Sequence, residues 1–158
     1  RESKGYTYGA RSAFSMWKQA GPFVASAAVK TSVTDSSVVE FMKELRRIWE
    51  EDVNAKELEF AKNSLVRRVP QTFETPQQIA GQLVSLVLYD LPDQYFDTYV
   101  QNLDRVSIGD VRRVAQKYIH PGASNIVIVG DVAVVKEGLE KLGYGNVQVL
   151  SSEGKMAN

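Results

Sequence analysis

Apolar and polar residues alternate along two segments in the first part of the chain, residues 6–15 and 23–33. Alternation with a period of two is typical of β-strands whose two faces meet different surroundings. Gly21-Pro22 lies between the two segments and is typical of a loop. The pattern therefore predicts a long antiparallel hairpin. One face of its first strand is expected to carry Tyr6, Tyr8, Ala10, Ser12 and Phe14.

The spacing of apolar residues changes to a helical period after the hairpin. The first helix is expected to start at Ser37, whose spacing to Glu40 fits a capping box, although Asp35 or Ser36 could cap it instead. The third helix is apolar on most sides and is expected to be the most buried element. The expected helices cover residues 37–49, 54–69, 75–88, 95–103, 107–118 and 132–142.

Two further segments resemble strands. Residues Asn125 to Val129 have the composition of a buried strand, and Val147 to Leu150 fit a short closing strand. The order of strands and helices predicts an α+β domain over residues 1–150, in which helices cover one side of an antiparallel sheet. Residues 151–158 are expected to form a flexible tail.

The amino-acid composition argues against several classes of function. The 158 residues carry 19 Lys and Arg against 19 Asp and Glu, a balance that argues against binding nucleic acid through many phosphate contacts. The absence of cysteine excludes thiol catalysis and cysteine-ligated zinc, but it does not identify the cellular compartment. The apolar run from Leu83 to Leu88 is too short to span a membrane.

The side chains that are most often catalytic do not form a complete catalytic site in this sequence. The single histidine, His120, follows a predicted helix beside Pro121, where a histidine usually interacts with the helix dipole or is exposed. A zinc site with two histidines is therefore impossible within this sequence. Glu57 and Glu59 could extend a carboxylate into a cleft, but they also fit an exposed helix face.

The first predicted strand has two polar side chains near its start that could bind a ligand. Arg1 and Tyr8 lie near its start, where a guanidinium and a phenol can converge on a carbonyl or carboxylate of a peptide-like ligand. The simpler interpretation is a half-buried strand that follows a charged turn. Residues alone therefore predict a soluble α+β domain without a complete active site.

The order of several short motifs resembles the pitrilysin family, the inverzincin zinc metallopeptidases that include insulin-degrading enzyme and mitochondrial processing peptidase. No single motif is specific for that family, but the series covers nearly the whole chain. The matching segments are Arg1–Gly9, Gly21-Pro22-Phe23, Glu57–Leu65, Glu74-Thr75-Pro76, Leu91–Phe96, Val106–Val111, Ala115–Tyr118 and Ile126–Asp131.

The resemblance implies a particular role. Members pair a zinc unit that carries H-x-x-E-H with a later, homologous unit that usually lacks the metal motif, and this chain resembles the later, C-terminal unit. Arg1 would hold a substrate carbonyl, and Tyr8 would hydrogen-bond the carbonyl or oxyanion. Tyr6 is a rival for the second role. The implied function is substrate binding for a zinc-dependent endopeptidase that hydrolyses peptides or unfolded segments.

The motif H-x-x-E-H is absent from this sequence, so no metal is expected here and zinc is expected in a partner unit. The chain also resembles a fragment that lacks the opening strand and helix of a complete unit. An exposed sheet edge would then pair with the missing segment or with a second copy. The alternatives are a proteolytically inactive structural subunit of the same fold, or an unrelated binding module with a chance Arg–Tyr pair.

Overall fold

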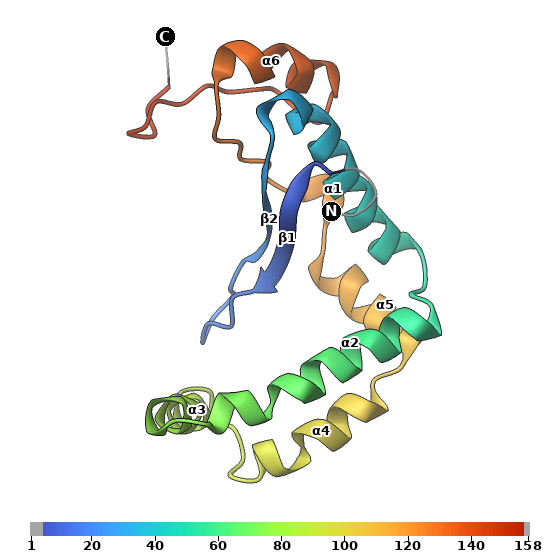
Figure 1. Ribbon diagram of the computed structural model, residues 1–158, viewed down its shortest axis with the longest axis vertical. Coiled ribbons are helices and arrows are strands. Elements are labelled where there is room, and N and C mark those ends of the chain that lie inside the picture. The colour runs from blue at the N-terminus through green and yellow to red at the C-terminus, as the bar shows by residue number, and fades with distance from the viewer. Residues whose placement is uncertain (1–4, 157–158) are drawn as a thin grey trace. The chain divides into compact units, whose positions relative to one another are not determined.

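A computed structural model describes residues 5–156, apart from the side chain of Tyr8 (Figure 1). Within these residues, two strands and six α-helices confirm the predicted α+β class. Their bounds are β1 Thr7–Phe14, β2 Phe23–Val29, α1 Thr34–Glu50, α2 Ala55–Arg68, α3 Pro76–Leu88, α4 Tyr95–Arg105, α5 Ile108–Tyr118 and α6 Val132–Lys141. Short 3-10 helices occupy Thr31–Val33 (η1), Pro70–Phe73 (η2) and Pro121–Ala123 (η3).

The chain divides into two compact units. One contains Arg1–Phe14, Phe23–Arg47 and His120–Asn158, and the other contains Ser15–Pro22 and Ile48–Ile119. The first unit therefore holds the two strands, and the second holds the loop between them and helices α2 to α5. None of the helices in residues 5–156 is long and apolar enough to cross a bilayer.

The predicted hairpin forms in the first unit. Strands β1 and β2 are antiparallel, and Phe14 lies opposite Phe23 with the two ring centroids 4.8 Å apart. Exposure alternates along β2, because Phe23, Ala25, Ala27 and Val29 are partly buried and the residues between them are exposed. The alternation in the sequence therefore predicted correctly which residues lie on each face of β2.

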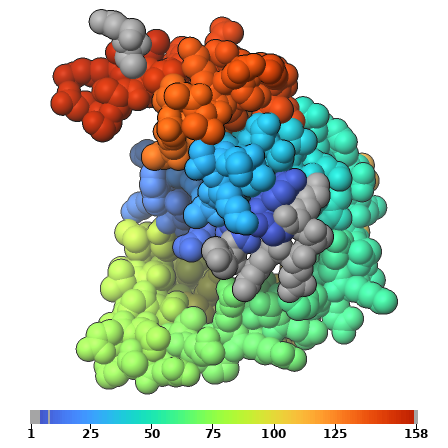
Figure 2. All heavy atoms as spheres, turned by 45° about the horizontal axis from the view of Figure 1, so that its top comes forward, coloured from blue at the N-terminus to red at the C-terminus, as the bar shows by residue number. Residues whose placement is uncertain are grey.

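Helix α6 also belongs to the first unit. It packs on η1, and Figure 2 shows α6 in orange against the light-blue start of α1. Gly138 lies beside Asp35 at this contact, and a Cβ added to Gly138 would touch the Asp35 side chain at 3.4 Å, the near limit of ordinary van der Waals contact. The start of α1 therefore lies beside a helix that begins 98 residues later in the chain, at Val132.

Three predicted helix starts are confirmed by capping boxes. In each, the side chain of the N-cap residue accepts from a backbone N–H three residues later, and the side chain of that later residue accepts from the N-cap backbone. Such caps pair backbone donors that have no partner within the helix. The pairs are Asn54 with Glu57 at α2, Thr75 with Gln78 at α3 and Ser107 with Asp110 at α5.

The predicted start of α1 is wrong. The helix begins at Thr34, three residues before Ser37, and Ser37 donates from its hydroxyl to the Val33 carbonyl, 2.7 Å away. The turn η1 leads directly into α1, so neither Ser37 nor its rivals Asp35 and Ser36 stands before the helix. Helix α1 therefore continues directly from η1 and does not begin at the side-chain cap that the sequence pattern predicted.

The two later strands are also wrong predictions. Residues 125–129 form no strand, and Val127 and Val129 are 85% and 98% exposed. In the segment from 147 to 150, only Leu150 pairs, in an isolated bridge with Met156 around a tight turn. A strand needs neighbours for its backbone groups, and among the described residues the only pairing of these two segments is the single bridge at Leu150.

Helix α3 is not the most buried element. No residue in it is buried, and Leu83, Val84 and Val87 are 57%, 61% and 85% exposed. Within the second unit it packs chiefly on η2. An apolar sequence predicts burial only where neighbouring elements cover the helix, and the described chain leaves much of α3 uncovered. The buried hydrophobic residues in the described chain are instead Met42, Ala115 and Ile119.

Candidate functional site

The predicted site lies at the start of β1, in the first unit. Arg1 is outside the described residues. The backbone of Tyr8 lies in β1, and its side chain is outside the described part. Tyr6 immediately precedes β1, is partly buried, and accepts through its carbonyl from the Lys30 amide at 3.3 Å. The structure therefore defines the backbone on which the predicted site is built.

A left-handed turn leads into this backbone. Gly5 has φ of 62°, a conformation that residues with a Cβ rarely adopt. A Cβ added at Gly5 would meet nothing within 4 Å, so backbone conformation, and not crowding, favours glycine there. The turn sets the direction of the backbone at the start of β1.

The pairing of β1 with β2 changes register beside Tyr8. Ala10 lies opposite Ala27, whereas Thr7 lies opposite Val29. Three steps along β1 therefore match two steps along β2, which is one extra residue in β1 between Thr7 and Ala10. Such an irregularity is a β-bulge, and bulges are common beside active sites because they change the direction of a side chain.

The Thr7 hydroxyl bridges the two strands at this bulge. It accepts from the Gly9 amide at 3.1 Å and donates to the Ala28 carbonyl at 2.6 Å. The Gly9 carbonyl is a second possible acceptor for the Thr7 hydroxyl, but at 2.9 Å it is farther away than the Ala28 carbonyl. The hydroxyl therefore supplies a partner for a backbone group at the point where the regular ladder is interrupted.

The bulge corrects one sequence expectation. Directly opposed residues of an antiparallel pair share a face, so Thr7 shares the face of Val29, Ala27 and Ala10. Tyr6, the residue before Thr7, therefore lies on the opposite face from Ala10, not on the same one as predicted. Period-two counting fails at a bulge because the extra residue reverses the faces of everything before it.

Sequence reasoning missed Thr7, although a signal was present. Glycine inside a strand often marks a bulge, and Gly9 lies two residues from a threonine whose hydroxyl can bond to nearby backbone groups. The local sequence Thr7-Tyr8-Gly9 thus carries both elements of the observed geometry.

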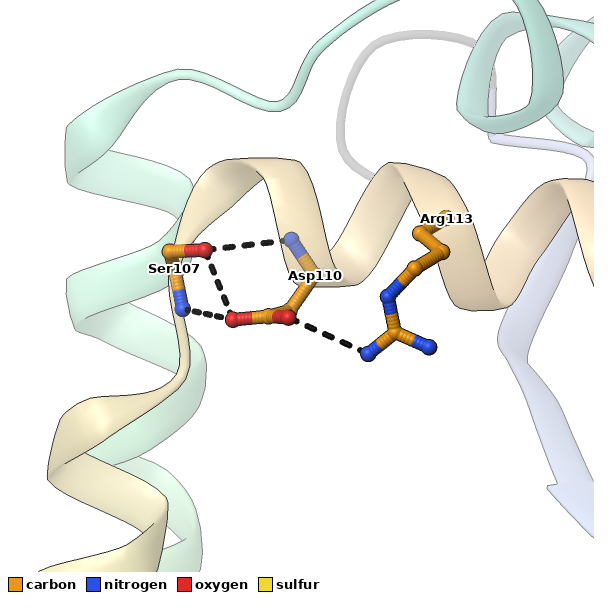
Figure 3. Close-up of polar contacts among 3 residues, drawn as sticks. All are labelled: Ser107, Asp110 and Arg113. Carbon is orange, nitrogen blue, oxygen red and sulfur yellow. Dashed lines mark hydrogen bonds and ion pairs between the residues drawn. The ribbon is translucent and has the colours of Figure 1, made fainter.

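A second polar cluster lies in the other unit at the start of α5, where Figure 3 shows Ser107, Asp110 and Arg113. The Ser107 hydroxyl donates to Asp110 Oδ2 at 2.7 Å, and the Ser107 backbone N–H donates to the same oxygen at 3.0 Å. Arg113 Nη2 donates to the other carboxylate oxygen at 3.1 Å.

These contacts change the acidity of Asp110. The Ser107 side-chain and backbone hydrogen bonds, with Arg113 beyond them, lower its pKa from 3.8 to about 2. Hydrogen bonds to a carboxylate favour the charged form. The three donors all come from the first two turns of α5 and its N-cap residue, so this cluster is a helix cap and not a catalytic acid.

The other predicted candidates have structural or exposed positions. Glu57 accepts from the Asn54 amide at 3.0 Å as part of the α2 cap, and Glu59 is exposed. His120 is exposed before η3. Across residues 5–156, no three His, Cys, Asp or Glu side chains gather where they could hold a metal ion. The residues that the structure describes do not fit a zinc site.

The fold matches a solved structure. The crystal structure of the peptidase M16 inactive domain from Pseudomonas fluorescens superposes with a TM-score of 0.68 and 22% sequence identity. The match covers 77% of this chain and 29% of that chain. No family model matches this sequence, and no curated protein matches it. At this identity the likeness confirms the predicted peptidase-unit fold.

Proposed function

We propose that this chain is the substrate-binding, non-metal domain of a zinc-dependent endopeptidase. It acts with a unit that carries H-x-x-E-H, on the same polypeptide or a separate subunit, and their substrates are peptides or unfolded polypeptide segments. The observation that carries the proposal is the fold shared with a peptidase inactive domain. The order of short motifs, with Arg1 and Tyr8 at the head of the hairpin, supports the same assignment.

In this proposal the chain contributes recognition and charge stabilisation. The Arg1 guanidinium offers a fixed fork of donors for a substrate carbonyl. The Tyr8 hydroxyl donates to the oxyanion that develops when the peptide carbonyl is attacked. The partner's zinc supplies the activated water. Tyr6 keeps the role of a rival donor, and a direct comparison of the two tyrosines decides between them.

The sheet supports a partner as well. Within residues 5–156 it contains only β1 and β2, so the outer edges of these two strands have no described strand beside them. Unpaired edges are templates for pairing with another chain. We expect such an edge to pair with a further segment of the parent protein or with a second copy of this chain.

The test is reconstitution. The full-length polypeptide or complex that contains this chain is purified, its zinc content is measured, and hydrolysis of an internally quenched fluorescent peptide is followed. The proposal expects no hydrolysis by this chain alone, hydrolysis by the zinc-bearing unit with this chain, and loss of activity after chelation. Equal activity of the zinc-bearing unit without this chain contradicts the proposal. Absence of activity in the zinc-containing assembly supports an inactive structural subunit instead.

A further inference from the structure

We infer that Thr7 is a positioning residue for the site at Tyr8, through a hydroxyl that holds the β-bulge in β1. The inference rests on the proposed function for its catalytic consequence, and on the hairpin geometry for its structural part. Thr7 itself is not expected to contact the substrate.

The bulge places two residues of β1 opposite one residue of β2. Tyr8 and Gly9 both lie between the pairs Thr7–Val29 and Ala10–Ala27, where β2 offers the single residue Ala28. Two residues opposite one leave part of the hydrogen-bond ladder without partners. The Thr7 hydroxyl compensates, because it accepts from the Gly9 amide and donates to the Ala28 carbonyl.

The contacts of the Thr7 hydroxyl disfavour a regular pairing of the two strands. A regular ladder continued from Ala10 opposite Ala27 would place Tyr8, and not Thr7, opposite Val29. The chain before the bulge would then slide by one residue, about 3.3 Å along the strand. Such a slip also exchanges the faces of the residues that move. The hydroxyl therefore selects between two registers of the segment that carries the predicted site.

Displacement of a catalytic group by about 1 Å can lower a rate by about a hundredfold. A register slip moves the Tyr8 backbone by more than that, so loss of the Thr7 hydroxyl should lower kcat even though Tyr8 itself is unchanged. Serine retains a hydroxyl on the same Cβ, whereas valine retains the shape of threonine without it.

The experiment compares Thr7→Val, Thr7→Ser and Ser12→Ala. Ser12 is a matched control, because its exposed hydroxyl lies in the regular part of β1 opposite Ala25. Register is read by NMR from backbone contacts across the hairpin, and turnover is read in the assembled enzyme with a quenched peptide. We expect Thr7→Val to replace the residue 7–Val29 contact by a Tyr8–Val29 contact and to lower kcat at least about tenfold. Thr7→Ser and Ser12→Ala should keep both the contact between residue 7 and Val29 and the original kcat.

Each contrary result has a separate meaning. An unchanged register in Thr7→Val overturns the structural part, and a shifted register with normal turnover overturns the positioning role. Thr7→Ala replaces Thr7→Val if the valine variant does not fold. Tyr8→Phe is assayed beside them: normal turnover in Tyr8→Phe overturns the proposed function, whereas loss in Tyr8→Phe with normal turnover in Thr7→Val overturns the positioning role alone.

Discussion

The Thr7 hydroxyl donates a hydrogen bond across the hairpin to the Ala28 carbonyl, 2.6 Å away. This contact lies where β1 and β2 pass from one register to another. A single side chain thus connects a local sequence feature to the register of the strand segment that contains Tyr8.

The hairpin loop depends on Gly21. A Cβ at this position would lie 1.8 Å from the Ser15 carbonyl oxygen, and a backbone oxygen cannot move aside as a flexible side chain can. The same loop is closed by a hydrogen bond from the Ser15 amide to the Pro22 carbonyl at 2.9 Å. We expect Gly21→Ala to lower the free energy of unfolding by about 1–3 kcal/mol, measured by urea unfolding.

Gly81 provides a matched control for that substitution. It lies inside α3, where an added Cβ would meet nothing within 4 Å. Alanine is favoured over glycine within a helix, so Gly81→Ala should raise the unfolding free energy by about 0.5–1 kcal/mol. If both substitutions change stability in the same direction, the steric explanation for Gly21 is wrong.

Ser107 stabilises the start of α5 through its side chain. Its hydroxyl accepts from the Asp110 amide at 3.1 Å, which gives a partner to one of the donors left free at a helix N-terminus. Ser107→Ala should lower the unfolding free energy by about 1 kcal/mol, and Ser107→Asn or Ser107→Asp should recover most of the loss. Equal destabilisation by all three variants contradicts a capping role.

Asp110 should make the stability of this unit depend on pH. Its pKa is lowered from 3.8 to about 2, chiefly by the Ser107 hydrogen bonds, so the folded state favours the charged carboxylate. The stabilisation is present above the unfolded-state pKa of 3.8 and is lost as pH falls from 3.8 through about 2. Urea midpoints of the original chain and Asp110→Asn should therefore differ at pH 6 and converge near about pH 2. A constant difference across that range contradicts the assignment.

Arg1 should contribute mainly to substrate binding. A guanidinium binds a carbonyl with several donors in a planar fork, which a lysine ammonium cannot reproduce. In the assembled enzyme, Arg1→Lys should raise KM for a peptide substrate by about tenfold, a loss on the scale of one charged hydrogen bond. Arg11→Lys in the middle of β1 is the control and should leave KM unchanged. Equal effects of the two substitutions would remove Arg1 from substrate recognition.

Local patterns predicted the elements that depend on neighbouring residues. The caps at Asn54, Thr75 and Ser107 involve partners three residues away, and the hairpin needs only two adjacent strands and a loop. Both kinds of signal are contained in short windows of sequence. This explains why the helix starts at α2, α3 and α5 and the alternation of β2 were predicted correctly.

The failures share a different cause. Residues 125–129 and helix α3 have apolar sequences, but whether such segments are paired or buried depends on what lies beside them. The start of α1 depends on the preceding 3-10 turn, and the faces of β1 depend on an inserted residue. At the site itself, the resemblance implies Arg1 and Tyr8, strand alternation adds Tyr6 as a rival, and the hydrogen bonds of Thr7 depend on the register that the bulge sets.

The most direct test of the proposed function is the turnover of Tyr8→Phe in the assembled, zinc-containing enzyme, with Tyr6→Phe as its matched control. Each substitution removes one hydroxyl and retains the aromatic ring. Loss of a donor to the oxyanion predicts that Tyr8→Phe lowers kcat at least about tenfold, while Tyr6→Phe stays close to the original enzyme. Unchanged kcat in Tyr8→Phe would contradict the central claim, and a loss confined to Tyr6→Phe would transfer the role to Tyr6.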